Sequence, residues 1–200
     1  DMTAENGAVQ AVTVCQNGQT YDLPARQVVL ALGHSARDTF EMLYRAGLHI
    51  EQKPFAVGVR IEHRQSDMDA AQYRALAGHP ALPPSTYKLS CHLDNGRSAF
   101  SFCVCPGGQV VAAVTNGMSE YARDGENING ALLVNVTPAD FPSEHPLAGM
   151  AWQRQLEAAA YALTGGYDAP CQRVEDFLAG RPSEAAGRVK PTHRPGVVYT

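Results

Sequence analysis

The side chains best suited to bind a small ligand lie in a polar stretch, residues 115–130. Arg123 carries a planar guanidinium that can bind a carboxylate or a phosphate through two parallel hydrogen bonds. The amides of Asn116, Asn127 and Asn129 can donate and accept hydrogen bonds, and so fix a planar polar group. The alternative is that these side chains bond only to the backbone of their own loop. The predicted substrate-binding residues are Arg123, Asn127, Asn129 and Asn116.

A second chemistry, contact with a dinucleotide, is suggested by the end of an apolar segment. Residues 27–32 are apolar after the first residue and begin with two β-branched valines, which is typical of a strand covered on both faces. Gly33 and His34 follow, and a glycine at such a strand end lets the backbone pass close to a cofactor. An ordinary strand that ends at a glycine would have the same pattern. We predict that Gly33 and His34 contact the cofactor.

The phosphates of a dinucleotide have no evident anchor in this sequence. None of the 18 glycines falls into the G-x-G-x-x-G spacing that lets a backbone approach a pyrophosphate. We therefore expect the chain alone to bind no dinucleotide, the main anchor lying outside it.

The cysteines offer a metal site as a third hypothesis. Cys103 and Cys105 are two apart on a predicted strand, so they would share a face and could meet Cys91 and His92 on the paired strand. However, C-x-C lacks the knuckle spacing of zinc sites, and free cysteines are often buried as small hydrophobic residues. We predict no metal site. The 7 histidines have no Ser or Asp partner legible in the sequence, so the catalytic residues stay unknown.

The elements that position these side chains begin with a hairpin and a helix. Residues 9–16 alternate along the strand, and Asn17-Gly18 is the pair preferred by a tight hairpin turn. A helix should follow Ser35 as its cap and end at Gly47.

An antiparallel sheet should dominate the rest of the chain. Alternation predicts a strand at residues 55–62, a hairpin of residues 87–94 and 97–105, and a third meander strand at 109–114. Residues 115–130 read as a long loop before a strand at 131–136. The predicted helices span residues 66–76, 146–164 and 174–179. The fold class is α+β, dominated by an antiparallel sheet with helices, with a β-meander and a strand of a different domain at the front.

Composition narrows the partners. The chain has 16 basic and 20 acidic residues and no basic run that could follow a phosphate backbone, so we expect no nucleic acid. The longest apolar stretches are far shorter than the roughly 20 residues of a membrane helix, so we expect no membrane. The 5 cysteines are odd in number, which argues against a secreted disulfide framework and favours the cytoplasm. Both ends read as cut from a longer chain.

Several long strings resemble a family of bacterial FAD-dependent dehydrogenases whose substrate is uncharacterised. These strings are CPGG at 105–108, TNGMS at 115–119, ARDGEN at 122–127, ALLVNVTPADF at 131–141, PFAVGVRIEH at 54–63, YKLSCHLDNGR at 87–97 and QRVEDFLAGRPS at 172–183. The resemblance covers essentially the whole chain in order, and it places the chain in the two-dinucleotide-fold flavoproteins as an internal fragment.

The resemblance implies a division of labour within a longer parent enzyme. Residues 1–36 would be part of the FAD-binding domain, residues 37–190 an inserted substrate or cap domain, and residues 191–200 the start of the return. FAD would be the parent's cofactor, a small molecule its substrate, and this fragment would be inactive alone. One departure is that family members have several more residues between Ala113 and Val114, so either the loop is short here or a stretch is missing from the sequence. The competing interpretation is an interaction or dimerisation module, with a possible homodimer.

Overall fold

The computed structural model describes residues 1–111 and 116–200, and it divides into two compact units, Asp1–Glu51 and Gln52–Thr200. Each unit is described by itself. The domain borders expected after residues 36 and 190 stay a prediction. The proposed short connection between Ala113 and Val114 lies outside the described residues.

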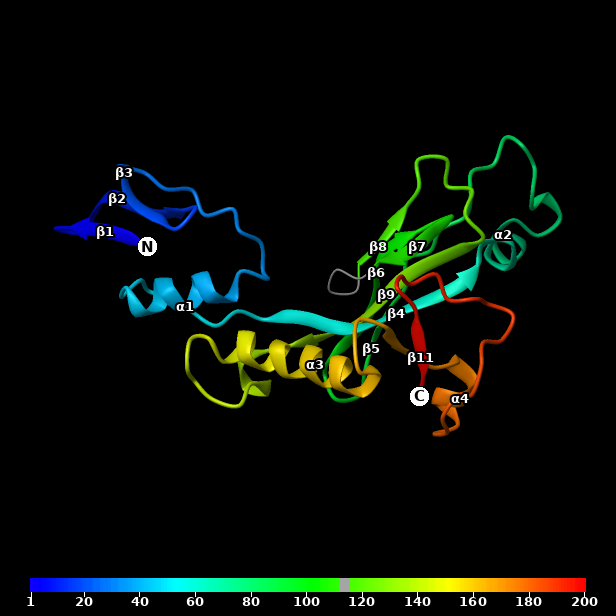
Figure 1. Ribbon diagram of the computed structural model, residues 1–200. Helices are drawn as coiled ribbons and strands as arrows, with labels where there is room; N and C mark the ends of the chain where they lie inside the picture. Colours follow the sequence, from blue (N-terminus) through cyan, green and yellow to red (C-terminus); the bar gives the residue numbers. More distant parts are fainter. Residues whose placement is uncertain (112–115) are drawn as a thin grey trace. The chain divides into compact units, whose positions relative to one another are not determined.

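The first unit contains the predicted hairpin, extended by one strand (Figure 1). Strands β1 (Met2–Glu5), β2 (Ala8–Gln16) and β3 (Gln19–Pro24) form an antiparallel sheet in that order. Asn17 and Gly18 form the turn with φ of 52° and 78°, the left-handed conformation for which this pair is favoured. The hairpin prediction is confirmed.

The buried strand predicted at residues 27–32 is wrong. These residues have no strand structure, and Val29 is 89% exposed. An extended segment needs neighbouring strands for its backbone hydrogen bonds, and no described strand pairs with this one. Helix α1 (Arg37–Arg45) follows with Ala36 as its N-cap and no side-chain cap, so the predicted capping by Ser35 is also wrong.

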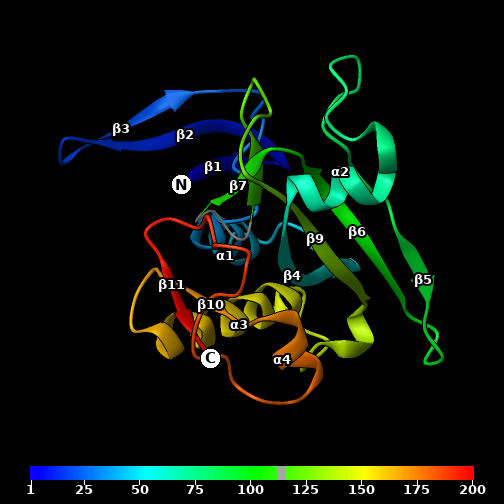
Figure 2. The same cartoon turned by 90° about the vertical axis from the view of Figure 1, so that its right-hand side faces the viewer.

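The second unit is built around a four-stranded antiparallel sheet (Figures 1 and 2). Its strands are β4 (Phe55–Arg64), β9 (Asn127–Val136), β6 (Ser98–Cys105) and β5 (Ser90–His92), in the order β4-β9-β6-β5. The β5–β6 hairpin is confirmed, with Gly96 in its turn at φ 80°. The α+β class with a dominant antiparallel sheet is likewise confirmed.

Two predictions on the chain between β6 and β9 are wrong. Strand β7 (Gly108–Val111) does not continue a meander beside β6; it pairs with β8 (Asn116–Ser119) in a separate sheet, and β9 takes the place beside β6. The predicted loop 115–130 is largely strand, because β8 and the start of β9 lie within it. Polar residues in a strand were mistaken for a loop because they break the apolar alternation.

Helices and a short parallel pair complete the second unit. They are α2 (Gln65–Tyr73), η1 (Arg74–Leu76), η2 (Pro138–Asp140), α3 (Ala148–Thr164), β10 (Ala169–Cys171), α4 (Val174–Leu178) and β11 (Val197–Tyr199). Strands β10 and β11 run parallel. Helix α3 ends at Gly165 in the left-handed conformation, as the sequence predicts.

The apolar core of this unit lies where α3 crosses one end of the sheet. Val136, Phe141 and Ala148 are buried, and Phe55, Val57 and Trp152 pack against them. The rings of Phe55 and Phe141 stack with centroids 5.4 Å apart. In the described part of the chain, no helix is long and apolar enough to cross a membrane.

Candidate functional site

The β4–β9 strand pair carries a polar network at the end away from the apolar core. Register pairs Glu62 of β4 with Asn129 of β9, and Arg64 with Asn127. Because side chains alternate along a strand, Arg60, Glu62, Asn127 and Asn129 share one face of the sheet. The sequence patterns predicted a strand here but did not identify Arg60 and Glu62 as site residues.

The described contacts of Arg60 with Asn129, Cys103 and Cys105 hold its guanidinium in one orientation. Its Nε donates to Asn129 Oδ1 at 2.9 Å, and its Nη2 donates to the carbonyl oxygen of Cys103 at 2.5 Å. The same Nη2 lies 3.7 Å from Cys105 Sγ. A guanidinium fixed in this way is ready to meet an anion without losing further rotamer freedom. Burial raises the pKa of the Cys105 thiol although Arg60 opposes the rise, so the thiol is protonated near neutral pH.

Glu62 joins the sheet to the chain segment before the C-terminus. Its carboxylate accepts from Asn127 Nδ2 at 3.1 Å, from the Thr192 backbone N–H at 3.0 Å and from the Thr192 hydroxyl at 2.5 Å. Thr192 Oγ1 in turn accepts from the backbone N–H of Val110 at 2.9 Å. A second donor contact of Asn127 goes to the carbonyl oxygen of Lys190 at 2.8 Å. Glu62 thus ties β4, β7, β9 and residues 190–192 together.

Strand β8 lies directly over Arg60 and Asn129. A Cβ at Gly117 would fall 1.9 Å from Asn129 Oδ1 and 2.4 Å from Arg60 Nη2. Only glycine therefore fits there. Asn129 is fully buried, and among the described residues its Nδ2 has no hydrogen-bond partner. Within the described part of the network, this buried donor is not satisfied.

The turn after β6 is anchored by a second polar cluster. Gln65 Oε1 accepts from the Gly107 backbone N–H at 2.9 Å, and Gln65 Nε2 donates to the Ser85 carbonyl oxygen at 3.0 Å. Asp69 Oδ1 accepts from the Ser85 backbone N–H at 2.8 Å and from Gln65 Nε2 at 2.8 Å. Burial alone would raise the pKa of Asp69, but the hydrogen bonds from Ser85 and Gln65 lower it. This cluster fixes the turn that leads into β7.

The predicted substrate residues are only partly brought together. Asn127 and Asn129 lie on β9 inside the network, and the Asn127 amide donates only to groups of this chain in the described structure. Arg123 is exposed in the segment between β8 and β9, where its carbonyl packs so closely on Gly107 that a Cβ there would lie 2.0 Å away. Asn116 pairs with Val111 at the start of β8, and its side chain lies outside the described residues.

The cysteines do not form the predicted face. A β-bulge between Phe102 and Cys105 breaks the alternation, and Cys103 has a φ of 48°. Cys103 is consequently exposed whereas Cys105 is buried, and Cys91 pairs farther along the strand with Ala99. The expectation that Cys103 and Cys105 both point toward Cys91 is wrong, and among the described residues no cluster of His, Cys, Asp and Glu could hold a metal.

An aromatic pair lies on the face of the sheet opposite to the one that carries Arg60 and Glu62. The rings of His63 and Tyr87 meet edge to face with centroids 5.7 Å apart. Burial lowers the pKa of His63, and burial raises the pKa of Tyr87 against the opposing charge of Arg60. Both side chains are therefore neutral near pH 7, which suits their packing against each other.

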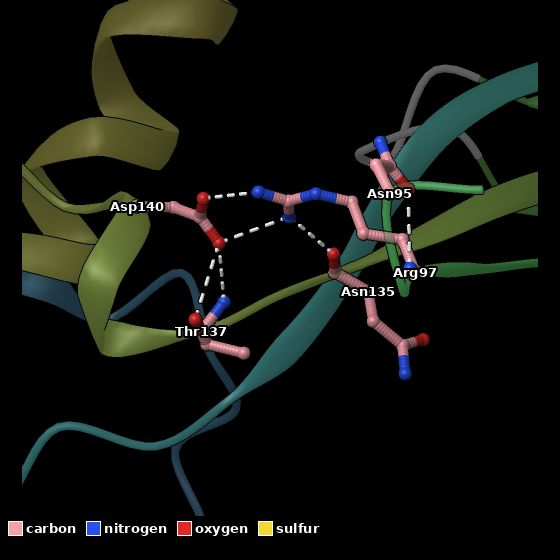
Figure 3. Close-up of polar contacts among 5 residues, drawn as sticks. All are labelled: Asn95, Arg97, Asn135, Thr137 and Asp140. Atoms are coloured by element: carbon pink, nitrogen blue, oxygen red, sulfur yellow. Dashed lines mark hydrogen bonds and ion pairs between the residues drawn. The ribbon is translucent and has the colours of Figure 1, made fainter. Parts of the chain in front are cut away.

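The β5–β6 hairpin is fastened to the start of the α3 region by an ion pair (Figure 3). Arg97 donates to both carboxylate oxygens of Asp140, and its Nη1 donates to the Asn135 carbonyl oxygen at 2.8 Å. Asp140 also accepts from the Thr137 backbone N–H at 2.8 Å. These bonds, led by the one from Arg97, hold the pKa of Asp140 far below its usual range. The cluster has a structural role, because every group in it is used within the chain.

The predicted cofactor residues line a hollow of about 380 Å³ in the first unit. Its walls are Leu30, Ala31, Leu32, Gly33, His34, Phe40 and Leu43. Gly33 has a φ of 71°, but a Cβ there would meet nothing within 4 Å, so no close approach requires this glycine. A dinucleotide phosphate needs converging backbone N–H groups or cations, and these walls are almost entirely apolar. The residues fit contact with an apolar group and do not fit a complete FAD site.

The comparisons with known proteins give the class. Residues 54–200 match the family described as FAD-dependent protein, C-terminal domain-like, and the chain belongs to this family. An uncharacterized protein of Clostridium beijerinckii is 44% identical over 207 residues, covering 99% of this chain and 38% of that protein. The chain thus spans well under half the length of this relative. The FAD-dependent part of the predicted resemblance is confirmed, while the two-dinucleotide-fold class and the fragment status stay predictions.

Proposed function

We propose that this chain is the part of a longer FAD-dependent oxidoreductase, a dehydrogenase, that covers the flavin and shapes the substrate pocket. The family match over residues 54–200 supports it, as does the relative of which this chain covers only 38%. In such enzymes the flavin carries the hydride chemistry, while the protein binds, orients and excludes water. The full-length protein, in this proposal, joins this chain to a flavin-binding part, and the chain alone is inactive.

The preorganised guanidinium of Arg60 carries the proposal. It is half-buried and held by Asn129 and by the bulged carbonyl of Cys103. A fixed cation in a partly water-excluded site attracts an anionic substrate more strongly than a mobile surface cation does. We assign Arg60 to binding an anionic substrate group, with Asn129 as the residue that positions it.

The substrate-binding residues predicted from the sequence take different roles in this proposal. Arg123, which is exposed before β9, is in this proposal a second cation that binds the substrate. The Nδ2 of Asn129 has no partner among the described residues, whereas Asn127 serves to hold Glu62 and Lys190. Asn116, at the start of the strand that carries Gly117, stays a proposed pocket residue.

The test is a titration of the full-length protein, purified with FAD, using benzoate as a carboxylate probe and the flavin absorption as readout. Replacing Arg60→Gln should weaken benzoate binding by about tenfold or more, the loss of one charge-assisted hydrogen bond. Arg154→Gln, on the exposed side of α3, is the matched control and should change nothing. Equal affinities in wild type and Arg60→Gln would reject the assignment.

A dimerisation module is the second candidate function. Strand β4 is ten residues long and is an edge of the described four-stranded sheet, with β9 as its neighbour. A long edge strand can pair with the same strand of another copy. Sedimentation of the 200-residue chain would support this function if a dimer forms, and a monomer at all concentrations would reject it.

A further inference from the structure

The apolar stripe of helix α3 continues past the core that it helps to form. Trp152 packs against Phe55 and Phe141 at the start of the helix. Leu156 and Leu163 follow at the helical spacing of the same face, but they are 44% and 61% exposed. The second half of this stripe is therefore not covered by the sheet.

Helix α4 exposes apolar side chains while a polar one is buried. Asp176 is buried and accepts from Arg181 Nε at 2.6 Å and from the Ser183 hydroxyl at 2.8 Å. Phe177 and Leu178, its neighbours, are 67% and 78% exposed. These polar bonds fix the helix with its apolar residues outward, an arrangement that costs free energy in water.

A parallel strand pair lies next to both helices (Figures 1 and 2). Strand β10 contacts α3, and β10 pairs only with β11 among the described strands. The Thr200 backbone N–H bonds to Cys171, and the Ser183 N–H bonds to Thr200, which ties the pair to the segment after α4. Parallel strands occur almost exclusively in larger sheets covered on both faces.

We propose that the exposed residues of α3 and α4, with the edge of the β10–β11 pair, are the surface on which the flavin-binding part of the full-length protein packs. This surface consists of Leu156, Leu163, Val174, Phe177 and Leu178. The occupant follows from length, since 62% of the relative lies outside the matched region, calculated as the remainder of the 38% covered. The inference rests on the proposed function, because that function supplies the second part.

The test compares lysine substitutions in two proteins, the full-length protein and the 200-residue chain. Leu163→Lys with Phe177→Lys should lower the melting temperature of the full-length protein by about 5 °C or more, since both lysines would be buried in the interface. Leu76→Lys is the matched control, because Leu76 is 60% exposed on η1, outside this surface. In the 200-residue chain all three substitutions should be nearly silent.

Two results would overturn the inference. One is a full-length protein that tolerates the double substitution as well as it tolerates Leu76→Lys. The other is self-association of the 200-residue chain that the double substitution abolishes, which would make a second copy the occupant. The flavin bands of the wild-type full-length protein report separately on the proposed function, since the interface is read from melting temperatures alone.

Discussion

The two ends of the β4–β9 pair use the same backbone register for opposite purposes. At one end Phe55 pairs with Val136 and packs against Phe141 in the apolar core. At the other end Glu62 pairs with Asn129 within a hydrogen-bonded network. Apolar packing is non-directional, whereas hydrogen bonds and charges fix side-chain orientation. The first end therefore holds the unit together, and the second end is suited to holding Arg60 in place.

The comparison is tested most strongly by removing an aromatic ring from the core end. Phe141→Ala should lower the free energy of unfolding by about 3 to 5 kcal/mol, because a buried ring and its packing contacts are lost. Phe102→Ala removes the same ring from an exposed position on β6 and should cost under about 1 kcal/mol. Urea unfolding measures both. Similar losses in the two variants would mean that the core has been misplaced.

At the polar end of the β4–β9 pair, the Glu62 carboxylate accepts hydrogen bonds from both Asn127 and Thr192. Glu62→Gln should cost about 1 to 3 kcal/mol, because an amide would turn a donor toward the Thr192 or Asn127 donors. Hydrogen exchange of the Thr192 amide should accelerate in the same variant. The exposed Glu184→Gln is the control. An unchanged Thr192 exchange rate would argue against the tie between the sheet and residues 190–192.

Gly117 tests how closely β8 approaches the network. Gly117→Ala should cost about 1 to 2 kcal/mol, since the new methyl group would overlap Asn129 Oδ1 and Arg60 unless β8 shifts. Gly166→Ala is the matched control, because nothing lies within 4 Å of its Cβ position. Thermal unfolding of both variants suffices. Equal stability of the two variants would show that β8 does not press on the pair.

The smallest effect is expected from the surface ion pair of Arg97 and Asp140. The folded-state pKa of Asp140 is depressed, so its contribution is complete above the ordinary carboxyl pKa of about 4 and is lost as the pH falls below it. Asp140→Asn should therefore be less stable than wild type at pH 7, with a deficit that shrinks at pH 3. Urea unfolding at both pH values measures it. A deficit that is constant or grows at low pH would contradict this role.

The elements with regular alternation or helical spacing were predictable, and the polar strand was not. The Asn17-Gly18 and Asn95-Gly96 turns, strand β4 and helix α3 follow local patterns that decide their structure. At the start of β9, Glu62 accepts from the Asn127 amide and Arg60 donates to the amide oxygen of Asn129, a partnership between residues far apart in sequence. The bulge after Phe102 likewise arises from strand pairing, which local periodicity does not reveal.

The same limit explains the candidate site. Asn127 and Asn129 were recognisable as polar residues of interest, but their partners were not, because Arg60, Glu62 and Lys190 come from other parts of the chain. A cation and a carboxylate two apart on a predicted strand, Arg60 and Glu62, were the available signal. The strand at residues 27–32 failed for the converse reason, since its apolar pattern has no partner strand among the described residues.

The visible absorption spectrum tests the central claim most directly. The full-length protein and the 200-residue chain would each be purified with added FAD and compared between 350 and about 500 nm, where bound flavin absorbs. We predict flavin bands in the full-length protein and none in the chain alone. Flavin bound by the chain itself, or by neither protein, would contradict the proposal that this domain covers a flavin held elsewhere.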